Sequence, residues 1–394
     1  MKITNIKCRD LRGTMEHPGT FWEERLSRPI DIYPEHRAEG PQWLEPLGAD
    51  TYRMRAVFVE VETDAGITGV SGPVSSSIAR VIMSEFEDLL LDRDPLAVEL
   101  LWDVMYRSAV HGRKGSSMMA ISALDCALWD IRGKWADAPV YRLLGGPTRD
   151  SIPAYASMLG FSVEPEAAAE RAREYAAKGY RAQKWFFRAG PADGPAGIER
   201  NVALVRAVRE AIGPDHDLML DCWMSWDLRY AQIMAPLLAP YSPRWIEEPA
   251  LPDKPDVVAQ IRRAVPFPVS NGEHEYTRWG FRHLLEIGAQ DVLQPDIYWA
   301  GGISEVVKIA TLASVYDIAV IPHGHSTHAT AHLSAALPPN LCFIQEYLVK
   351  WNTIHQFFLK HKLEPVNGVI ALPTAPGLGI EIDEDLVEDE TVLD

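Results

Sequence analysis

The sequence has little of what marks nucleic-acid-binding, membrane-spanning or disulfide-stabilised proteins. Its 394 residues carry 38 Lys and Arg against 55 Asp and Glu, a net charge of −17, and no basic block offsets this, so we expect no nucleic-acid partner. No apolar run approaches the ~20 residues of a membrane span, and we expect no membrane association. The start, MKITNIKC, has no apolar signal segment, which predicts a cytoplasmic protein. The four cysteines are scattered, without zinc or disulfide spacing, which fits reduced thiols: Cys8, Cys126, Cys222 and Cys342.

What the sequence does have is a repeat of short apolar runs, each ending on an acid or a histidine. The terminal residues of these runs are Asp221, Glu247, Glu273, Asp296, His323 and Glu346. Their successive separations are 26, 26, 23, 27 and 23 residues, the length of one strand, one helix and two connections. The period predicts a (β/α) barrel with a functional group at the C-terminal end of each strand, where such barrels place their active sites.

The chain is longer than the roughly 250 residues of a bare barrel, so it predicts a barrel with a second, smaller domain. Strand-like alternation near the N-terminus, with a hairpin turn at residues 64–66, places that domain first. We expect an N-terminal domain over residues 1–135 and the barrel over 136–360. The segment 361–394 is expected to fold back on the N-terminal domain.

Three carboxylates, Asp221, Glu247 and Glu273, would stand on adjacent strand ends. Carboxylates this close repel one another unless a cation lies among them, and a hard divalent ion with oxygen ligands, above all Mg²⁺, suits such a set. The alternative is three structural or solvated acids at loop starts. The equal spacing favours Glu247 over Glu248 as the ligand, with Glu248 expected on the opposite side of the strand.

His323 and Asp296 form the next predicted pair. A carboxylate that accepts a hydrogen bond from one imidazole nitrogen leaves the other free to take a proton, so the pair is a candidate general base. The alternative is a buried pair that only joins two strands. Glu346 is a candidate to support a developing oxyanion, and Lys184 to neutralise a substrate carboxylate, unless its side chain extends outward to solvent.

Substrate contacts are expected from irregular segments and from residues beside the strand ends. The long Pro- and Trp-rich segment 16–50 and the segment 106–115 lack periodicity, which is typical of specificity loops. The candidate substrate-binding residues are Trp22, Arg25, His111, Arg113, Trp223, His274, His325 and Ser326. A zinc site formed by His323, His325 and His328 is a weaker interpretation, because these residues lie across from the acids.

The order of these residues, with Glu247-Glu248-Pro249 and the helix-like segment Ile121 to Lys134, resembles the mandelate racemase subgroup of the enolase superfamily over essentially the whole chain. The segments LMLDCWMS, WIEE, GEH and PHGHS are most similar to L-rhamnonate dehydratase-like acid-sugar dehydratases. The resemblance implies a (β/α)7β modified TIM barrel under an α+β capping domain built from the N-terminal region and the C-terminal tail. It also implies Mg²⁺, an acid–base step next to a carboxylate and a homo-oligomer.

Two departures from the family pattern bear on the reaction. Phe186 stands where racemases of the group carry a second base, and Trp223 stands where some dehydratases carry a histidine. The prediction is therefore an Mg²⁺-dependent dehydratase of a small-molecule acid sugar, in which His323 removes the α-proton and then protonates the leaving β-hydroxyl. The alternatives are a racemase or epimerase of a hydroxy acid, and a non-catalytic sugar-acid-binding barrel.

Overall fold

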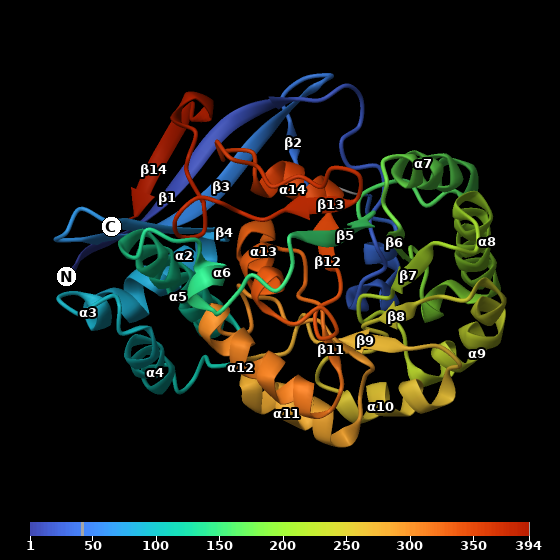
Figure 1. The fold of residues 1–394 in the computed structure, drawn as a ribbon. Helices are drawn as coiled ribbons and strands as arrows, with labels where there is room; N and C mark the ends of the chain where they lie inside the picture. The colour runs from blue at the N-terminus through green and yellow to red at the C-terminus, as the bar shows by residue number, and fades with distance from the viewer. Residues whose placement is uncertain (41–42, 394) are drawn as a thin grey trace.

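Two sheets organise the chain in the computed structural model, which describes residues 1–40 and 43–393. One is antiparallel and built mainly from the N-terminal region, and the other is a curled parallel sheet surrounded by helices (Figure 1). This is the predicted fold class, an α/β barrel with an α+β domain beside it. No helix within the described ranges is both long and apolar enough to cross a membrane.

The antiparallel sheet has the order β14-β1-β3-β2, with β4 on β3. Its strands are β1 (Ile3–Glu16), β2 (Glu45–Pro46), β3 (Thr51–Thr63), β4 (Thr68–Val74) and β14 (Asp389–Leu393). Buried and exposed positions alternate along β1, as expected for a strand with one face on a core. In Figure 1 the last strand, drawn in red, lies beside the first, drawn in blue.

Helices cover one face of this sheet and connect it to the barrel. They are α2 (Ser76–Val81), a π-helical turn (Ile82–Phe86), α3 (Glu87–Leu90), α4 (Val98–Ser108), α5 (Ser116–Trp135) and α6 (Val140–Leu143). Gly69 of β4 lies so close to α5 that a Cβ there would meet Ala127 O at 2.2 Å, which is why a glycine is needed. On the barrel side, Asp125 of α5 accepts hydrogen bonds from Ser304, and these contacts hold the two sheets in one arrangement. The helix begins at Ser116, with Gly115 at the N-cap position.

The curled sheet runs in the order β11-β10-β9-β8-β7-β6-β5-β12, all parallel. Its strands are β5 (Ser151–Ser157), β6 (Ala182–Phe186), β7 (Asp217–Asp221), β8 (Trp245–Glu247), β9 (Val269–Asn271), β10 (Val292–Leu293), β11 (Ala319–Val320) and β12 (Gln345–Leu348). The helices between them are α7 (Pro165–Ala177), α8 (Gly194–Ile212), α9 (Leu228–Leu238), α10 (Pro255–Ala264), α11 (Thr277–Ile287), α12 (Gly302–Val315) and α13 (Thr327–Ala336). Eight strands with seven intervening helices give the expected (β/α)7β alternation.

The remaining elements are short. They are the helical turns Pro29–Ile32, α1 (Pro34–Arg37), Pro191–Asp193, Ala239–Tyr241 and Glu384–Leu386, with helix α14 (Val349–His355) and strand β13 (Val369–Ala371). Strand β13 pairs antiparallel with β5.

Strand alternation places the polar residues of the site. An apolar cluster fills the inside of the curled sheet, and side chains two positions apart on a strand share a face. The residue two positions after each cluster member is therefore inward as well. These pairs are Tyr155 and Ser157, Ala182 and Lys184, Met219 and Asp221, Trp245 and Glu247, and Val292 and Gln294. Ile321 and His323 follow β11 at the same spacing.

A loop from the N-terminal region, residues 17–40 with Trp43, lies over the C-terminal ends of the strands; residues 41 and 42 lie outside the described ranges. Backbone hydrogen bonds fasten it to the barrel, from Glu23 N to Gly160 O (2.7 Å) and from Ser27 N to Phe187 O (2.7 Å). The buried ammonium of Lys350 adds bonds to Glu23 (3.0 Å) and Gly160 O (2.9 Å). The loop is thus part of the wall above the strand ends.

Candidate functional site

Lys184 lies at the centre of three buried carboxylates. Its ammonium is 2.8 Å from Glu346 Oε1 and 3.3 Å from Asp221 Oδ2, and it also pairs with Glu247 Oε1. The Lys184 side chain is 3% exposed and those of Glu247 and Glu346 are fully buried. Lys184 therefore extends inward, and not outward to solvent.

The pKa values of this cluster follow from burial and mutual charge. Burial opposes the charge of Lys184, but the facing carboxylates outweigh it and hold the pKa of Lys184 well above its usual range. Burial raises the pKa of Glu247 to about 8 despite the nearby ammonium, and burial likewise raises the pKa of Asp221. For Glu346, burial is outweighed by Lys184 and His323, which lower its pKa. The site holds more acid than one lysine can neutralise, so it favours a further cation.

His323 and Asp296 form a buried pair. The imidazole Nδ1 lies 2.7 Å from Asp296 Oδ2, and Asp296 Oδ1 accepts from Tyr298 N at 2.7 Å. The other imidazole nitrogen, Nε2, lies 3.8 Å from Glu273. Burial disfavours the imidazolium, but Glu273 and Asp296 outweigh it and raise the pKa of His323 to about 10.

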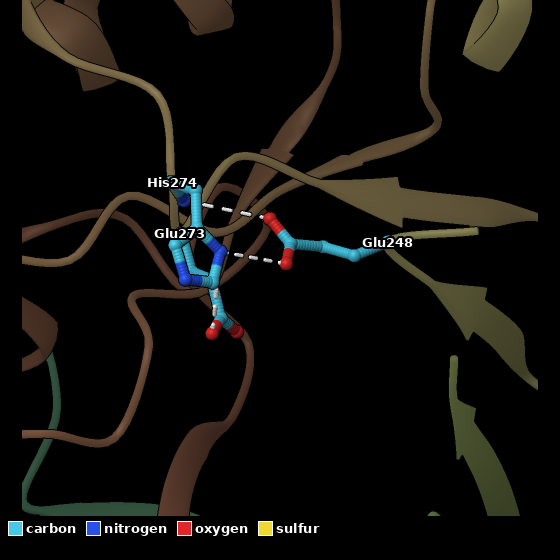
Figure 2. Close-up of side chains that lie close together, drawn as sticks. All are labelled: Glu248, Glu273 and His274. Atoms are coloured by element: carbon cyan, nitrogen blue, oxygen red, sulfur yellow. Dashed lines mark hydrogen bonds and ion pairs between the residues drawn. The ribbon is translucent and has the colours of Figure 1, made fainter. Parts of the chain in front are cut away.

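Figure 2 shows a second imidazole–carboxylate pair, Glu248 with His274, together with Glu273. Glu273 lies near both His274 and His323. Glu248 follows β8 with a φ of +43°, and its carboxylate meets His274 Nδ1 at 2.8 Å. Glu273 Oε1 lies 3.6 Å from the same nitrogen. Glu248 is thus buried against His274. Burial lowers the pKa of His274, but Glu248 raises it more, to about 9.

The residues present fit a hard divalent cation, because the buried carboxylates supply more anionic oxygen donors than Lys184 and the two histidines balance. In the part of the chain that the structure describes, the ligand atoms of Glu248, Glu273 and His274 lie within 4.8 Å of one another. The predicted trio is arranged differently, since Asp221 and Glu247 turn to Lys184 while Glu273 turns to the two histidines.

A cavity of about 870 Å³ opens above these groups. Its floor includes Lys184, Asp221, Glu273 and His323, and its walls come from Trp223, His325 and the N-terminal loop. Arg25 lines the cavity, yet its guanidinium is engaged with Asp31 (2.6 Å) and with backbone carbonyls of the same loop. Arg25 therefore shapes the loop more than it offers a free charge.

Five of the predicted substrate-binding residues do not line this cavity, and one of them is His274, which is paired with Glu248. Trp22 is buried against Trp43 and Trp351. His111 is exposed, and the Arg113 guanidinium lies over the Tyr106 ring at 4.9 Å. Ser326 is the N-cap of α13.

The sequence reasoning missed Trp299, Trp351 and His355, which all line the cavity. The Trp299 ring lies 5.2 Å from His323, 5.4 Å from His274 and 5.6 Å from His325, measured between ring centroids. The feature of the sequence that could have pointed to Trp299 is its position three residues after Asp296. Trp351 and His355 belong to α14, a helix after the last barrel strand that the period does not reach.

A curled parallel sheet with acids, a lysine and imidazole–carboxylate pairs at its C-terminal ends defines a class, the α/β-barrel enzymes. Comparison with known proteins narrows this class. Residues 167–386 match the model of the enolase C-terminal domain-like family, and residues 48–145 match the mandelate racemase / muconate lactonizing enzyme N-terminal domain.

The chain belongs to the enolase superfamily. It is 35% identical over 406 residues to an L-rhamnonate dehydratase of Saccharopolyspora erythraea, covering 98% of both chains. It is also 35% identical over 368 residues to a D-galactarolactone cycloisomerase of Agrobacterium fabrum, covering 89% of this chain and 94% of that one. A racemase from Streptomyces coelicolor A3(2), solved with bound magnesium, is similar with a TM-score of 0.81 and 25% identity, covering 98% of both chains. The chain is accordingly an enzyme.

Proposed function

We propose that the chain is a Mg²⁺-dependent dehydratase that converts a sugar-derived acid, an aldonate such as rhamnonate or a related pentonate or hexonate, to a 2-keto-3-deoxy acid. The observation that carries this proposal is the His323–Asp296 pair facing the same cavity as Lys184 and the acids. Such a pair can move a proton beside a carboxylate that the lysine helps to hold. The similarity to a protein named L-rhamnonate dehydratase supports the substrate class.

In this proposal Asp221, Glu247 and Glu273 hold the ion. When bound, Mg²⁺ would supply positive charge that stabilises the negative charge developing on the substrate carboxylate.

The proton transfers are assigned to the chain's own residues. A bound ion would offset the charge of Glu273, which raises the pKa of His323, and so favour the neutral imidazole. His323 Nε2 then takes the α-proton while Asp296 keeps the imidazole oriented through Nδ1. The electron pair of the broken C–H bond moves toward the carboxylate, which Lys184 neutralises, and Glu346 holds Lys184 in place. Expulsion of the β-hydroxyl then takes the proton back from His323, so water leaves, and the resulting enol tautomerises to the 2-keto acid.

The two imidazole–carboxylate pairs keep an epimerase or racemase as a second candidate. Phe186, buried at the end of β6, supplies no base, which disfavours inversion at the α-carbon. His274, however, carries its own carboxylate partner Glu248 and could act from another direction. The two reactions differ in product, since only dehydration yields a keto acid. We also propose a cytoplasmic homo-oligomer.

The test is formation of 2-keto acid from a panel of mono- and di-acid sugars in D₂O, with Mg²⁺ and with EDTA. We expect Mg²⁺-dependent keto acid from a monoacid, and a loss of about 10²- to 10⁴-fold in His323→Asn. The matched control is His361→Asn, whose side chain is 68% exposed. Exchange of the α-proton at the wild-type rate in His323→Asn would remove His323 from the mechanism. Deuterium at the α-carbon without keto acid would favour the epimerase.

A further inference from the structure

Apart from Lys184, the hydrogen-bond donors around the cluster engage only one oxygen on each of two proposed metal ligands. Glu247 Oε2 accepts from Gln294 Nε2 (2.8 Å) and Trp245 Nε1 (3.2 Å). Asp221 Oδ1 accepts from the backbone N–H of Trp223 at 3.0 Å. The oxygens that remain are Glu247 Oε1 and Asp221 Oδ2.

Both of these oxygens face the ammonium of Lys184. It pairs with Glu247 Oε1 and lies 3.3 Å from Asp221 Oδ2. A divalent cation that bound Asp221 and Glu247 through their available oxygens would meet the ammonium there. Two cations that share buried oxygens repel strongly, because little water screens them.

We infer that Lys184 is an internal counter-ion that competes with the divalent cation for Asp221 and Glu247. This inference rests on the metal ligands assigned in the proposed function. In the metal-free protein it neutralises these acids. When the cation enters, the ammonium has to leave their oxygens, and only then is it available to a substrate carboxylate. Loading is thereby ordered, with metal before substrate.

Glu346 gives the displaced ammonium a partner. Its Oε1 lies 2.8 Å from Lys184 Nζ, and its Oε2 accepts from Gly324 N at 2.9 Å, which fixes the carboxylate. Because Glu346 is not one of the proposed metal ligands, it can hold Lys184 in both states. Glu346 therefore acts as a positioning residue for Lys184.

The inference predicts opposite changes in Mg²⁺ affinity for two variants. In Lys184→Met the competitor is gone, so we expect Mg²⁺ to bind at least about tenfold more tightly. In Glu346→Gln the ammonium loses its alternative partner and is held by Asp221 and Glu247 alone, so we expect Mg²⁺ to bind several-fold more weakly. The matched control is Lys178→Met, a lysine 52% exposed that pairs with Glu174 on the surface, for which no change is expected.

The measurement is isothermal titration of Mg²⁺ into each EDTA-stripped protein, without substrate. Thermal unfolding in EDTA is a second readout, in which Lys184→Met should melt lower than wild type and recover more on adding Mg²⁺. Unchanged or weaker Mg²⁺ binding in Lys184→Met overturns the inference. If Lys184→Met does not fold, the Mg²⁺ affinity of Glu346→Gln tests the inference instead. Unchanged or tighter Mg²⁺ binding in Glu346→Gln then overturns the inference.

These outcomes are separable from the proposed function. The predicted affinity changes without any keto acid would leave the counter-ion role standing and defeat the dehydratase. Keto acid formation by the wild type, with an unchanged Mg²⁺ affinity in Lys184→Met, would support the dehydratase and defeat the counter-ion role. If wild type binds no Mg²⁺, the ligand assignment and the inference both fail.

Discussion

Replacement of Asp130 should destabilise the protein through two backbone amides that would lose their partner. Asp130 lies on α5 with a fully buried side chain, and it accepts from Val70 N (2.8 Å) and Leu378 N (2.6 Å). It thus joins β4 to the C-terminal segment. Its third contact, Lys134 at 2.7 Å, is half-buried and keeps Thr68 O as an acceptor, so Lys134 adds little to the cost.

The size of the effect follows from those two amides. A buried donor without a partner costs about 1–3 kcal/mol, so Asp130→Ala should lower the free energy of unfolding by roughly 2–6 kcal/mol. Asp130→Asn keeps one acceptor oxygen and should cost about half as much. The control Asp103→Ala removes a surface pair with Arg107 and should change stability by less than about 0.5 kcal/mol.

Urea unfolding followed by tryptophan fluorescence gives the stability differences. Hydrogen exchange locates them, because the Val70 and Leu378 amides should exchange faster in Asp130→Ala before the rest of the chain does. The reasoning fails if Asp130→Ala lies within about 0.5 kcal/mol of wild type. It also fails if the stability falls while both amides keep their wild-type protection.

Three further predictions concern other side chains. Burial lowers the pKa of His332 to about 3 from about 6.5 in the unfolded chain. Between these two pKa values the unfolded state binds one more proton than the folded state, so the free energy of unfolding should fall with decreasing pH by up to about 1.4 kcal/mol per pH unit. In acid unfolding, His332→Asn should show a smaller dependence of stability on pH than the wild type. The same dependence in both proteins would contradict this prediction. Lys350→Met removes the bonds that fasten the N-terminal loop, so limited proteolysis should cut residues 17–40 faster than in Lys360→Met, a surface control, and equal cutting would argue against a fastening role. Trp299→Leu removes ring contacts with three histidines, and each such pair is worth about 0.5–1.5 kcal/mol. The rate of keto acid formation should therefore drop about tenfold in Trp299→Leu, whereas Trp299→Phe should retain most of it. Equal rates in the two variants would show that the aromatic ring is not needed.

The inward side chains of the barrel could be predicted because one physical rule places them. Asp221, Glu247 and His323 each stand two positions after an apolar residue that fills the sheet, so an apolar run that ends on a polar residue implies an inward polar group. The period between strands then brings those groups to one end. No knowledge of side-chain contacts was needed for this step.

The residues that sequence reasoning could not place lie outside the alternation. Glu248 takes a positive φ just after β8, so its meeting with His274 depends on a turn that strand periodicity does not describe. Trp299 lies in a turn, and from the sequence alone a tryptophan at that position is interpreted as a residue of the hydrophobic core. Lys350 reaches Phe21 across 329 residues, and such a contact leaves no local signal in either segment.

The pairing of β1 with β14 has a consequence for how the chain is made. Arg9 and Glu390, joined across this pairing, are 381 residues apart. During synthesis the N-terminal sheet must wait, with the edge of β1 unpaired, until the whole barrel has left the ribosome. An unpaired strand edge invites pairing with other chains, and contacts this distant slow folding. A nascent chain stalled before β14 should therefore be more prone to aggregation than its length alone implies.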